Sequence, residues 1–151
     1  MITKEDIIRA QKQWSEGIIK MGEISNNRVL LESFVSEFLD DMYNFQEKVL
    51  FKPTKAKIEQ FRNNKESAIS YFIAGDTKKC IEDNGFALSK WSKIVFENSD
   101  IIIKENQGLA MGNYTFENNE SKIKVEYSFG YIKIKESIKI TLHHSSIPYQ
   151  N

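Results

Sequence analysis

The sequence predicts an α+β domain in which N-terminal helices pack against a strongly curved antiparallel sheet. Apolar residues recur at helical spacing as far as residue 73, and after Gly75 the pattern changes to the alternation typical of strands. A long antiparallel sheet must bury one face, so we expect it to curve around the helices and enclose an internal pocket, in the shape of a cone. The length of 151 residues fits a single domain, which we expect to span residues 1–151.

Two helices are predicted in the first third of the chain. Thr3 can cap the first helix, and the acidic residues Glu5 and Asp6 follow it in the first turn. This helix is predicted to end near residues 21–22, and residues at its core-facing spacing are Ile7, Gln11, Trp14, Ile18 and Met21. The second is predicted to begin near residues 25–27, and its apolar stripe, which we interpret as core, is Leu30, Leu31, Phe34, Val35, Phe38, Leu39 and Met42.

The middle of the chain is predicted to contain a loop and one short helix. Pro53 holds Lys52 away from helical angles, so residues 45–54 are predicted to form a loop or a short extended segment. The third helix is predicted over residues 65–73, ending at Gly75.

Strand-like alternation dominates the remainder of the chain. It is clearest at Ile123, Val125, Tyr127, Phe129 and Tyr131. Residues 118–120 and 135–137 are the predicted hairpin turns. The predicted strands are 87–96, 100–104, 108–116, 121–134 and 136–144.

Composition excludes several classes of protein. Lys plus Arg and Asp plus Glu both number 21, and this zero net charge argues against a nucleic-acid partner. The single cysteine, Cys80, cannot form an intrachain disulfide. No stretch approaches the roughly 18 apolar residues of a membrane span. We therefore expect no membrane partner and a cytoplasmic location, or a periplasmic one if a leader peptide has been removed.

The residues needed for a metal site are scarce. The chain has two histidines, which are adjacent, and a three-histidine zinc site is therefore impossible. A site made of His144 and two carboxylates stays open at this point. There is no HExxH, no CxxC and no glycine-rich phosphate loop, so we expect neither a metal nor another cofactor.

The two histidines lie at the end of the last predicted strand, in Thr141–Ser146. Because successive side chains of a strand point to opposite faces, the row of Ile138, Ile140 and Leu142 predicts that His144 and Ser146 face the core. His143 and Ser145 then belong to the opposite row, unless a bulge intervenes. Polar groups on a buried row either satisfy a core hydrogen bond or line a polar pocket.

Other hydroxyls also lie at the ends of apolar elements. Thr54 follows Pro53, Tyr71 lies in the third helix, and Thr115 and Tyr127 lie in the strands. Each is weak alone, since a buried Tyr is usually a core residue whose hydroxyl is bound to the backbone.

Several segments, in this order along the chain, resemble the iota class of carbonic anhydrases. That class is similar to the association domain of calcium/calmodulin-dependent protein kinase II, within the nuclear-transport-factor-2-like superfamily. The resemblance covers about residues 7–149 and is most specific in the LFKPT, SYF and HHSS motifs. The segments are Val49–Thr54, Ala68–Phe72, Glu82–Leu88, Ala110–Tyr114, Val125–Tyr131 and Leu142–Tyr149.

The resemblance implies a cone-shaped fold, a homo-oligomer, most simply a dimer, and reversible hydration of carbon dioxide to bicarbonate. The shortage of ligands favours the metal-free version of that reaction. Carried over by motif, Thr54 and Tyr71 match the KPT and SYF motifs, and the His-His-Ser-Ser cluster matches the terminal motif. The family motif often has a third, preceding histidine, where this chain has Leu142.

The mechanism expected at this point places carbon dioxide in a pocket walled by Phe and Ile. Thr54, Tyr71 and Ser146 would hold water and the developing bicarbonate, and His144 would accept the water's proton. The expected substrate-binding residues are His143, Ser145, Tyr127 and Thr115. The alternatives are a non-catalytic module of the same fold that oligomerises or binds a small ligand, and a different small-molecule lyase or isomerase.

Overall fold

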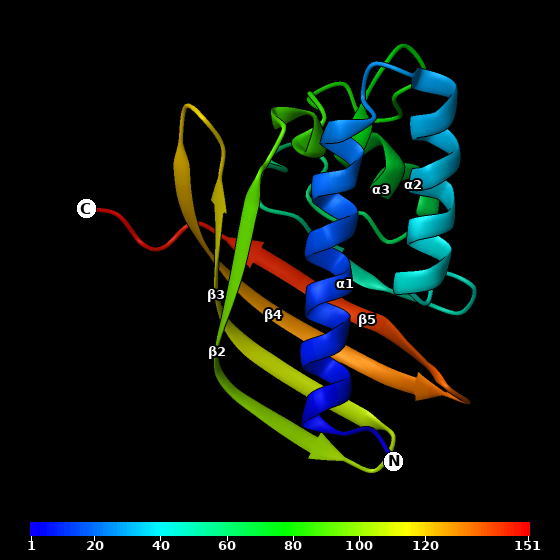
Figure 1. Ribbon diagram of the computed structural model, residues 1–151, viewed down its shortest axis with the longest axis vertical. Helices are drawn as coiled ribbons and strands as arrows, with labels where there is room; N and C mark the ends of the chain where they lie inside the picture. Colours follow the sequence, from blue (N-terminus) through cyan, green and yellow to red (C-terminus); the bar gives the residue numbers. More distant parts are fainter.

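The computed structural model describes residues 1–151, and its chain forms helices packed in the concave face of one curved sheet (Figure 1). The α+β prediction is therefore confirmed. The helices are α1 (Lys4–Glu23), α2 (Arg28–Met42), α3 (Lys65–Ile73) and the short 3-10 helix η1 (Phe86–Ser89). The strands are β1 (Leu50–Lys52), β2 (Lys93–Lys104), β3 (Gln107–Glu117), β4 (Lys122–Ile134) and β5 (Ser137–Ser146).

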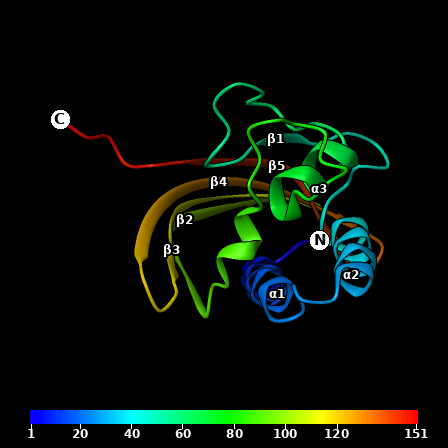
Figure 2. The same ribbon diagram turned by 90° about the horizontal axis from the view of Figure 1, so that it is seen from above.

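The sheet has the strand order β1-β5-β4-β3-β2, in which β1 runs parallel to β5 and every other pair is antiparallel. Seen from above, it curves around α1, with α2 beside that helix and α3 packed against α2 near β1 (Figure 2). The turns predicted at 118–120 and 135–137 join β3 to β4 and β4 to β5. No helix is both long and apolar enough to span a bilayer.

Local signals set the ends of the helices. The Thr3 side chain accepts from the Asp6 amide while the Asp6 carboxylate accepts from the Thr3 amide, so the start of α1 is a reciprocal capping box. Asn27 and Asn64 cap α2 and α3 in the simpler one-way manner. The predicted bounds of the third helix agree with those of α3.

The prediction of a strand from residue 87 to 96 is wrong at its first half. Residues 86–89 form η1, which is bracketed by Gly85 and Lys90, both at positive φ. A strand cannot continue through such left-handed positions. The chain instead enters β2 at Lys93, and one bulged strand replaces the two that were predicted between 87 and 104.

The second bulge, in β5, has the larger consequence. Gly130 of β4 pairs with Leu142, but the next residue, Tyr131, pairs with Ile140, so Thr141 is an extra residue without a partner. A Cβ on Gly130 would lie 3.0 Å from that of Leu142, which shows how closely the strands approach there. The extra residue reverses the alternation of every side chain that follows it.

Candidate active site

A small cavity lies at the centre of the fold, between α1, α3 and the inner face of the sheet. Its volume is about 10 Å³, which is room for about one water molecule. Aromatic rings form most of its wall, no Ile lines it, and none of its side chains is a carboxylate or an amine. The lining residues are Trp14, Phe51, Pro53, Thr54, Tyr71, Phe72, Phe86, Tyr114, Phe116, His143 and Ser145.

His143 forms one wall of the cavity and is only 2% exposed. Its ring lies between those of Phe129 and Phe51, with centroid distances of 4.1 and 4.7 Å and nearly parallel planes. Burial lowers the pKa of the imidazole well below its ordinary value, with a smaller contribution from His144. His143 is therefore a neutral imidazole held in one orientation.

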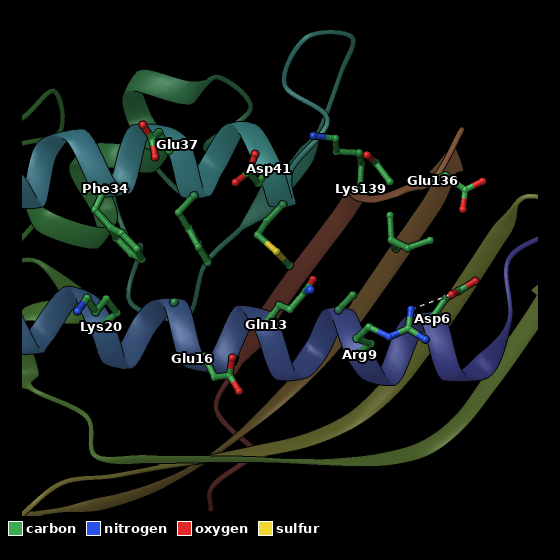
Figure 3. Close-up of a pocket in the computed structure, with 16 residues that line it drawn as sticks. Asp6, Arg9, Gln13, Glu16, Lys20, Phe34, Glu37, Asp41, Glu136 and Lys139 are labelled. Carbon is green, nitrogen blue, oxygen red and sulfur yellow. Dashed lines mark hydrogen bonds and ion pairs between the residues drawn. The ribbon is translucent and has the colours of Figure 1, made fainter.

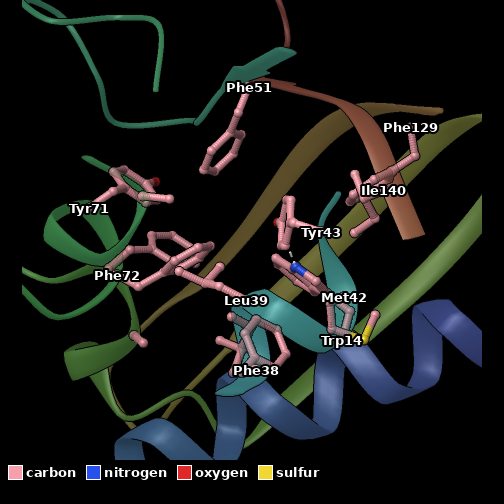
Figure 4. Close-up of a cluster of buried hydrophobic side chains, with 14 of the residues drawn as sticks. Trp14, Phe38, Leu39, Met42, Tyr43, Phe51, Tyr71, Phe72, Phe129 and Ile140 are labelled. Carbon is pink, nitrogen blue, oxygen red and sulfur yellow. Dashed lines mark hydrogen bonds between the residues drawn. The ribbon is translucent and has the colours of Figure 1, made fainter. Parts of the chain in front are cut away.

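Both ring nitrogens of His143 contact hydroxyl groups. Nδ1 lies 2.8 Å from the Tyr43 hydroxyl oxygen, and Nε2 lies 3.0 Å from that of Tyr114. Ser145 Oγ lies 3.2 Å from Nε2 and is hydrogen-bonded to the Tyr114 hydroxyl. Behind Tyr43, the indole N–H of Trp14 donates to its oxygen at 3.0 Å (Figure 4).

Thr54 and Tyr71 line the side of the cavity that faces α3. The Tyr71 side chain is buried, and its hydroxyl accepts from the Lys55 amide at 3.2 Å. Burial raises the pKa of Tyr71, and hydrogen bonds from Lys55 and Thr54 act against that rise. The pKa of Tyr114 is raised by burial too, with its bond to Ser145 opposing the rise. Both phenols are therefore protonated and act as hydrogen-bond donors at neutral pH.

A buried ion pair holds the loop that carries Thr54. Arg62, fully buried, donates to both carboxylate oxygens of Asp83 at 2.7 and 2.8 Å, and Ser70 on α3 donates to the same carboxylate at 2.6 Å. The Arg62 amide also donates to the Phe51 carbonyl at 2.7 Å. Removing one partner of such a pair costs about 3–5 kcal/mol. The pair therefore fixes the loop between β1 and α3 over the cavity.

Comparison with known proteins identifies the family. Residues 5–147 match the family described as metal-independent carbonic anhydrase. A metal-independent carbonic anhydrase from Nostoc sp. (strain PCC 7120 / SAG 25.82 / UTEX 2576) is 34% identical over 155 residues, covering 99% of this chain and 75% of the relative. The chain belongs to the metal-independent carbonic anhydrases.

Solved structures agree with that assignment. The chain is similar to the crystal structure of an iota-carbonic anhydrase from a cyanobacterium complexed with bicarbonate, with a TM-score of 0.93 and 31% identity over 99% of this chain and 94% of that one. A putative calcium/calmodulin-dependent protein kinase II association domain from Xanthomonas campestris, 16% identical, has a TM-score of 0.68 over 100% of this chain and 91% of that one. This second likeness concerns the fold alone. So does that to an NTF-2 like protein of unknown function from Shewanella oneidensis MR-1, 16% identical with a TM-score of 0.55 over 96% of this chain and 99% of that one, and it confirms the predicted nuclear-transport-factor-2-like fold.

The prediction that His144 and Ser146 face the core is wrong. The bulge at Thr141 turns His143 and Ser145 inward, and His144 is exposed on the outer face of the sheet. Ser146 lies on the same face, where its hydroxyl donates to Glu126 at 2.7 Å. In this carbonic anhydrase, His143 and Ser145 (the inner pair) line the cavity, and His144 and Ser146 (the outer pair) do not.

Two strand residues expected at the site also lie away from the cavity. Thr115 is on the outer face, because it alternates with Tyr114 and Phe116, whose side chains are buried. Tyr127 does face inward, but its hydroxyl donates to Asn98 at 2.7 Å and does not line the cavity. Burial raises the pKa of Tyr127 to about 12.

Thr54 and Tyr71 are brought to the cavity together with the inner pair, as the motifs imply. Tyr114, Tyr43 and Trp14 were not predicted as site residues. The sequence contained a signal for Tyr114, because the Ala110–Tyr114 segment is one of those that carry the resemblance. Tyr114 precedes Thr115 directly, and neighbouring side chains of a strand point to opposite faces. No group of three or more His, Cys, Asp or Glu side chains lies together where it could hold a metal ion.

A much larger hollow lies elsewhere. A groove of about 820 Å³ lies between α1, α2 and the start of β5, and it contains none of the predicted site residues. Figure 3 shows charged side chains of both signs along it, including the Arg9–Asp6 ion pair at 3.1 Å. Its open, charged lining does not suit an apolar substrate such as carbon dioxide.

Proposed function

We propose that this chain hydrates carbon dioxide in the central cavity, that the hydroxyls of Thr54, Tyr71, Tyr114 and Ser145 contact the reacting atoms, and that His143 supports the last two. The observation that carries the proposal is the convergence of four hydroxyls and one neutral imidazole on an otherwise aromatic cavity. Membership of the metal-independent carbonic anhydrases supplies the reaction. The finer assignment of residues to it is our own.

The cavity suits both the apolar substrate and the negative charge that develops during hydration. Carbon dioxide is apolar and packs favourably against rings such as Phe51 and Phe116. As water attacks the carbon atom, negative charge develops on the oxygens of carbon dioxide. Preorganised hydroxyl donors in a site without bulk water stabilise that charge strongly. Thr54 and Tyr71 supply donors on one side of the cavity, and Tyr114 and Ser145 supply them on the other.

The lack of charged side chains in the cavity constrains the proton transfer. The water oxygen forms a bond to carbon, and the electron pair of one C=O π bond moves to oxygen. The water proton passes to one hydroxyl of the Tyr114–Ser145 pair, and a hydroxyl proton of that pair passes to the new oxyanion. The product is carbonic acid, which ionises to bicarbonate and a proton when it reaches water. No step requires a charged base.

The substrate enters, in this proposal, next to Tyr71 and Phe86. Their rings stack with centroids 5.6 Å apart and separate the cavity from a surface hollow of about 190 Å³. Lys55 lines that hollow and lies 6.0 Å from the centre of the Phe86 ring. The cavity has space for about one water molecule, so these rings must move for carbon dioxide to enter.

Stopped-flow measurement of carbon dioxide hydration tests the proposal. The protein is first treated with a strong chelator and then passed through a desalting column. We expect a rate well above that of buffer, unchanged by the chelator. A rate equal to buffer would contradict the enzymatic function and favour a non-catalytic binding module. A rate abolished by the chelator and restored by a divalent metal would contradict the metal-free reaction.

We also propose a homodimer formed through the outer face of the sheet. Strand pairing aligns Ile102, Leu109, Gly130, Leu142 and Leu50 in one row across the sheet. Ile102, Leu109, Leu50 and the adjoining Met111 are 51–63% exposed, and exposed apolar patches of this kind commonly mark interfaces. A Met111→Lys variant should sediment as a monomer if wild type sediments as a dimer. A monomeric wild type would contradict the proposal.

A further inference from the structure

Two buried polar groups lie behind His143 and contact none of the four hydroxyls that line the cavity. The indole N–H of Trp14 and the hydroxyl of Tyr43 lie on the side of the imidazole away from the Tyr114–Ser145 pair. Trp14 and Tyr43 are each 2% exposed. The Trp14 ring lines the cavity, but its indole N–H and the Tyr43 hydroxyl make no hydrogen bond there, so any polar effect of these two groups on the reaction must pass through His143.

The hydrogen bonds of this pair determine which nitrogen of His143 carries the proton. An indole N–H can only donate, so the Tyr43 oxygen accepts from Trp14. The only remaining partner for the Tyr43 hydroxyl proton is His143 Nδ1, at 2.8 Å. Nδ1 therefore accepts and carries no proton. In a neutral imidazole the proton then lies on Nε2.

The opposite tautomer would leave a buried donor without a partner. With the proton on Nδ1, the Tyr43 oxygen would accept from both Trp14 and His143, and its own hydroxyl proton would have no acceptor. Buried donors in folded proteins are almost always paired, and no buried side-chain polar atom of this protein lacks a partner. Trp14 therefore acts on His143 through the Tyr43 hydroxyl, which does not line the cavity.

We propose that Trp14 and Tyr43 are positioning residues that hold His143 as the Nε2–H tautomer, so that a one-way chain of hydrogen bonds ends on a hydroxyl donor facing the substrate. This inference rests on the proposed function. The chain runs from Trp14 to Tyr43, to His143, and then to the Tyr114–Ser145 pair.

The direction of the chain assigns a role to the imidazole. His143 donates to the hydroxyl pair and does not accept a proton from it. Because Nε2 carries a proton, it cannot accept a hydrogen bond from Tyr114 or Ser145. One of the two hydroxyl protons forms the hydrogen bond between Tyr114 and Ser145. The other points to the cavity, and donation from Nε2 strengthens it as a donor. His143 thus makes the oxyanion site more polar without becoming charged.

Nitrogen NMR of the imidazoles tests the inference directly, because the chain contains two histidines only. The full chain is labelled with ¹⁵N-histidine, and the ring nitrogens are observed at about pH 7.5, where a neutral ring is expected. His144→Gln assigns the two rings. We expect His143 to show the pattern of a protonated Nε2 and an unprotonated, hydrogen-bonded Nδ1. A protonated Nδ1 would overturn the proposal without any activity measurement.

Variants then test whether Trp14 and Tyr43 impose the tautomer. Tyr43→Phe and Trp14→Phe should each shift the His143 signals toward a mixture of tautomers and lower kcat about tenfold, with KM changed less than twofold. Tyr131→Phe is the matched control, since it removes another buried phenol that has no contact with His143. It should change neither the signals nor kcat.

The outcomes separate this inference from the proposed function. Unchanged His143 signals in folded Tyr43→Phe would overturn the positioning role. If that variant does not fold, the wild-type spectrum and Trp14→Phe decide. A wild type with the expected tautomer that does not hydrate carbon dioxide would overturn the proposed function and, with it, the catalytic purpose of the chain of hydrogen bonds.

Discussion

The last four residues of β5 form two pairs with the same side chains and opposite surroundings. His143 and Ser145 lie on the inner face, where they are 2% and 1% exposed and contact each other and Tyr114. His144 and Ser146 lie on the outer face, and Ser146 there binds the carboxylate of Glu126. The same side chains therefore have different chemistry because one extra residue, Thr141, precedes them.

This difference shows that residue types alone do not determine the chemistry of a catalytic site. An imidazole between two phenylalanine rings is neutral and fixed, and can serve as a directed donor. The imidazole of His144 is exposed to solvent on the outer face of the sheet. The outer pair is consequently a matched control for the inner pair.

Replacing the two histidines should give the largest contrast. His143→Ala should lower the hydration rate about 1,000-fold, because it removes the donor to the hydroxyl pair and disorders Tyr114. It should also destabilise the fold by about 2–4 kcal/mol, since it leaves a cavity and an unpaired Tyr43 hydroxyl. His144→Ala should change neither quantity appreciably. Stopped-flow rates and urea unfolding measure both, and equal losses in the two variants would contradict the bulged register.

The serines should give the next contrast. Ser145→Ala should lower the hydration rate about 100-fold, the effect expected for one lost oxyanion donor. Ser146→Ala should stay within about twofold of wild type, because its hydroxyl binds only an exposed carboxylate. Thermal unfolding of both variants controls for folding. A larger loss in Ser146→Ala would restore the assignment that strict alternation predicts.

The helices could be predicted because their signals are local. Thr3 and Asp6 form the capping box from positions three apart, and the stripe through Trp14 and Ile18 needs no knowledge of the rest of the chain. Thr54 and Tyr71 were found through the motifs of the resemblance. In both cases the informative residues are neighbours in sequence.

The inner face of β5 could not be predicted in the same way, because its register depends on another strand. The bulge arises where Gly130 meets Leu142, and the alternation of β5 alone does not reveal it. Gly130 within an alternating strand was the available signal, since an isolated glycine there often marks a bulge. Tyr43 and His143 lie 100 residues apart in sequence, and only the fold brings them into contact.

Tyr71→Phe tests the opposite wall of the cavity. It should lower the hydration rate about tenfold, less than Ser145→Ala, because Thr54 still supplies a donor on the same side. The hydroxyl that is lost accepts one hydrogen bond from the Lys55 amide, so the midpoint of thermal unfolding should fall only slightly. Tyr149→Phe, at an 89% exposed tyrosine, controls for the substitution. A full rate in Tyr71→Phe would remove this residue from the site.

The smallest contrast lies in the pH dependence of stability. Burial lowers the pKa of His143, so below about pH 6.5 the unfolded chain binds a proton that the folded chain does not. The free energy of unfolding should therefore fall as the pH decreases, by up to about 1.4 kcal/mol per pH unit, until the pH reaches the folded pKa.

Urea unfolding at several values between about pH 5.5 and about pH 6.5 isolates this contribution, because carboxylates such as Asp6 and Glu82 titrate in the unfolded chain near 3.8 and 4.5, below that range. The decrease in the free energy of unfolding with decreasing pH should persist in His144→Gln and disappear in His143→Gln. Because the two substitutions remove the same titratable group one residue apart, only the surroundings of the ring differ between them. A slope that persists in His143→Gln would place the coupled proton outside the cavity and contradict the account of a buried, neutral imidazole.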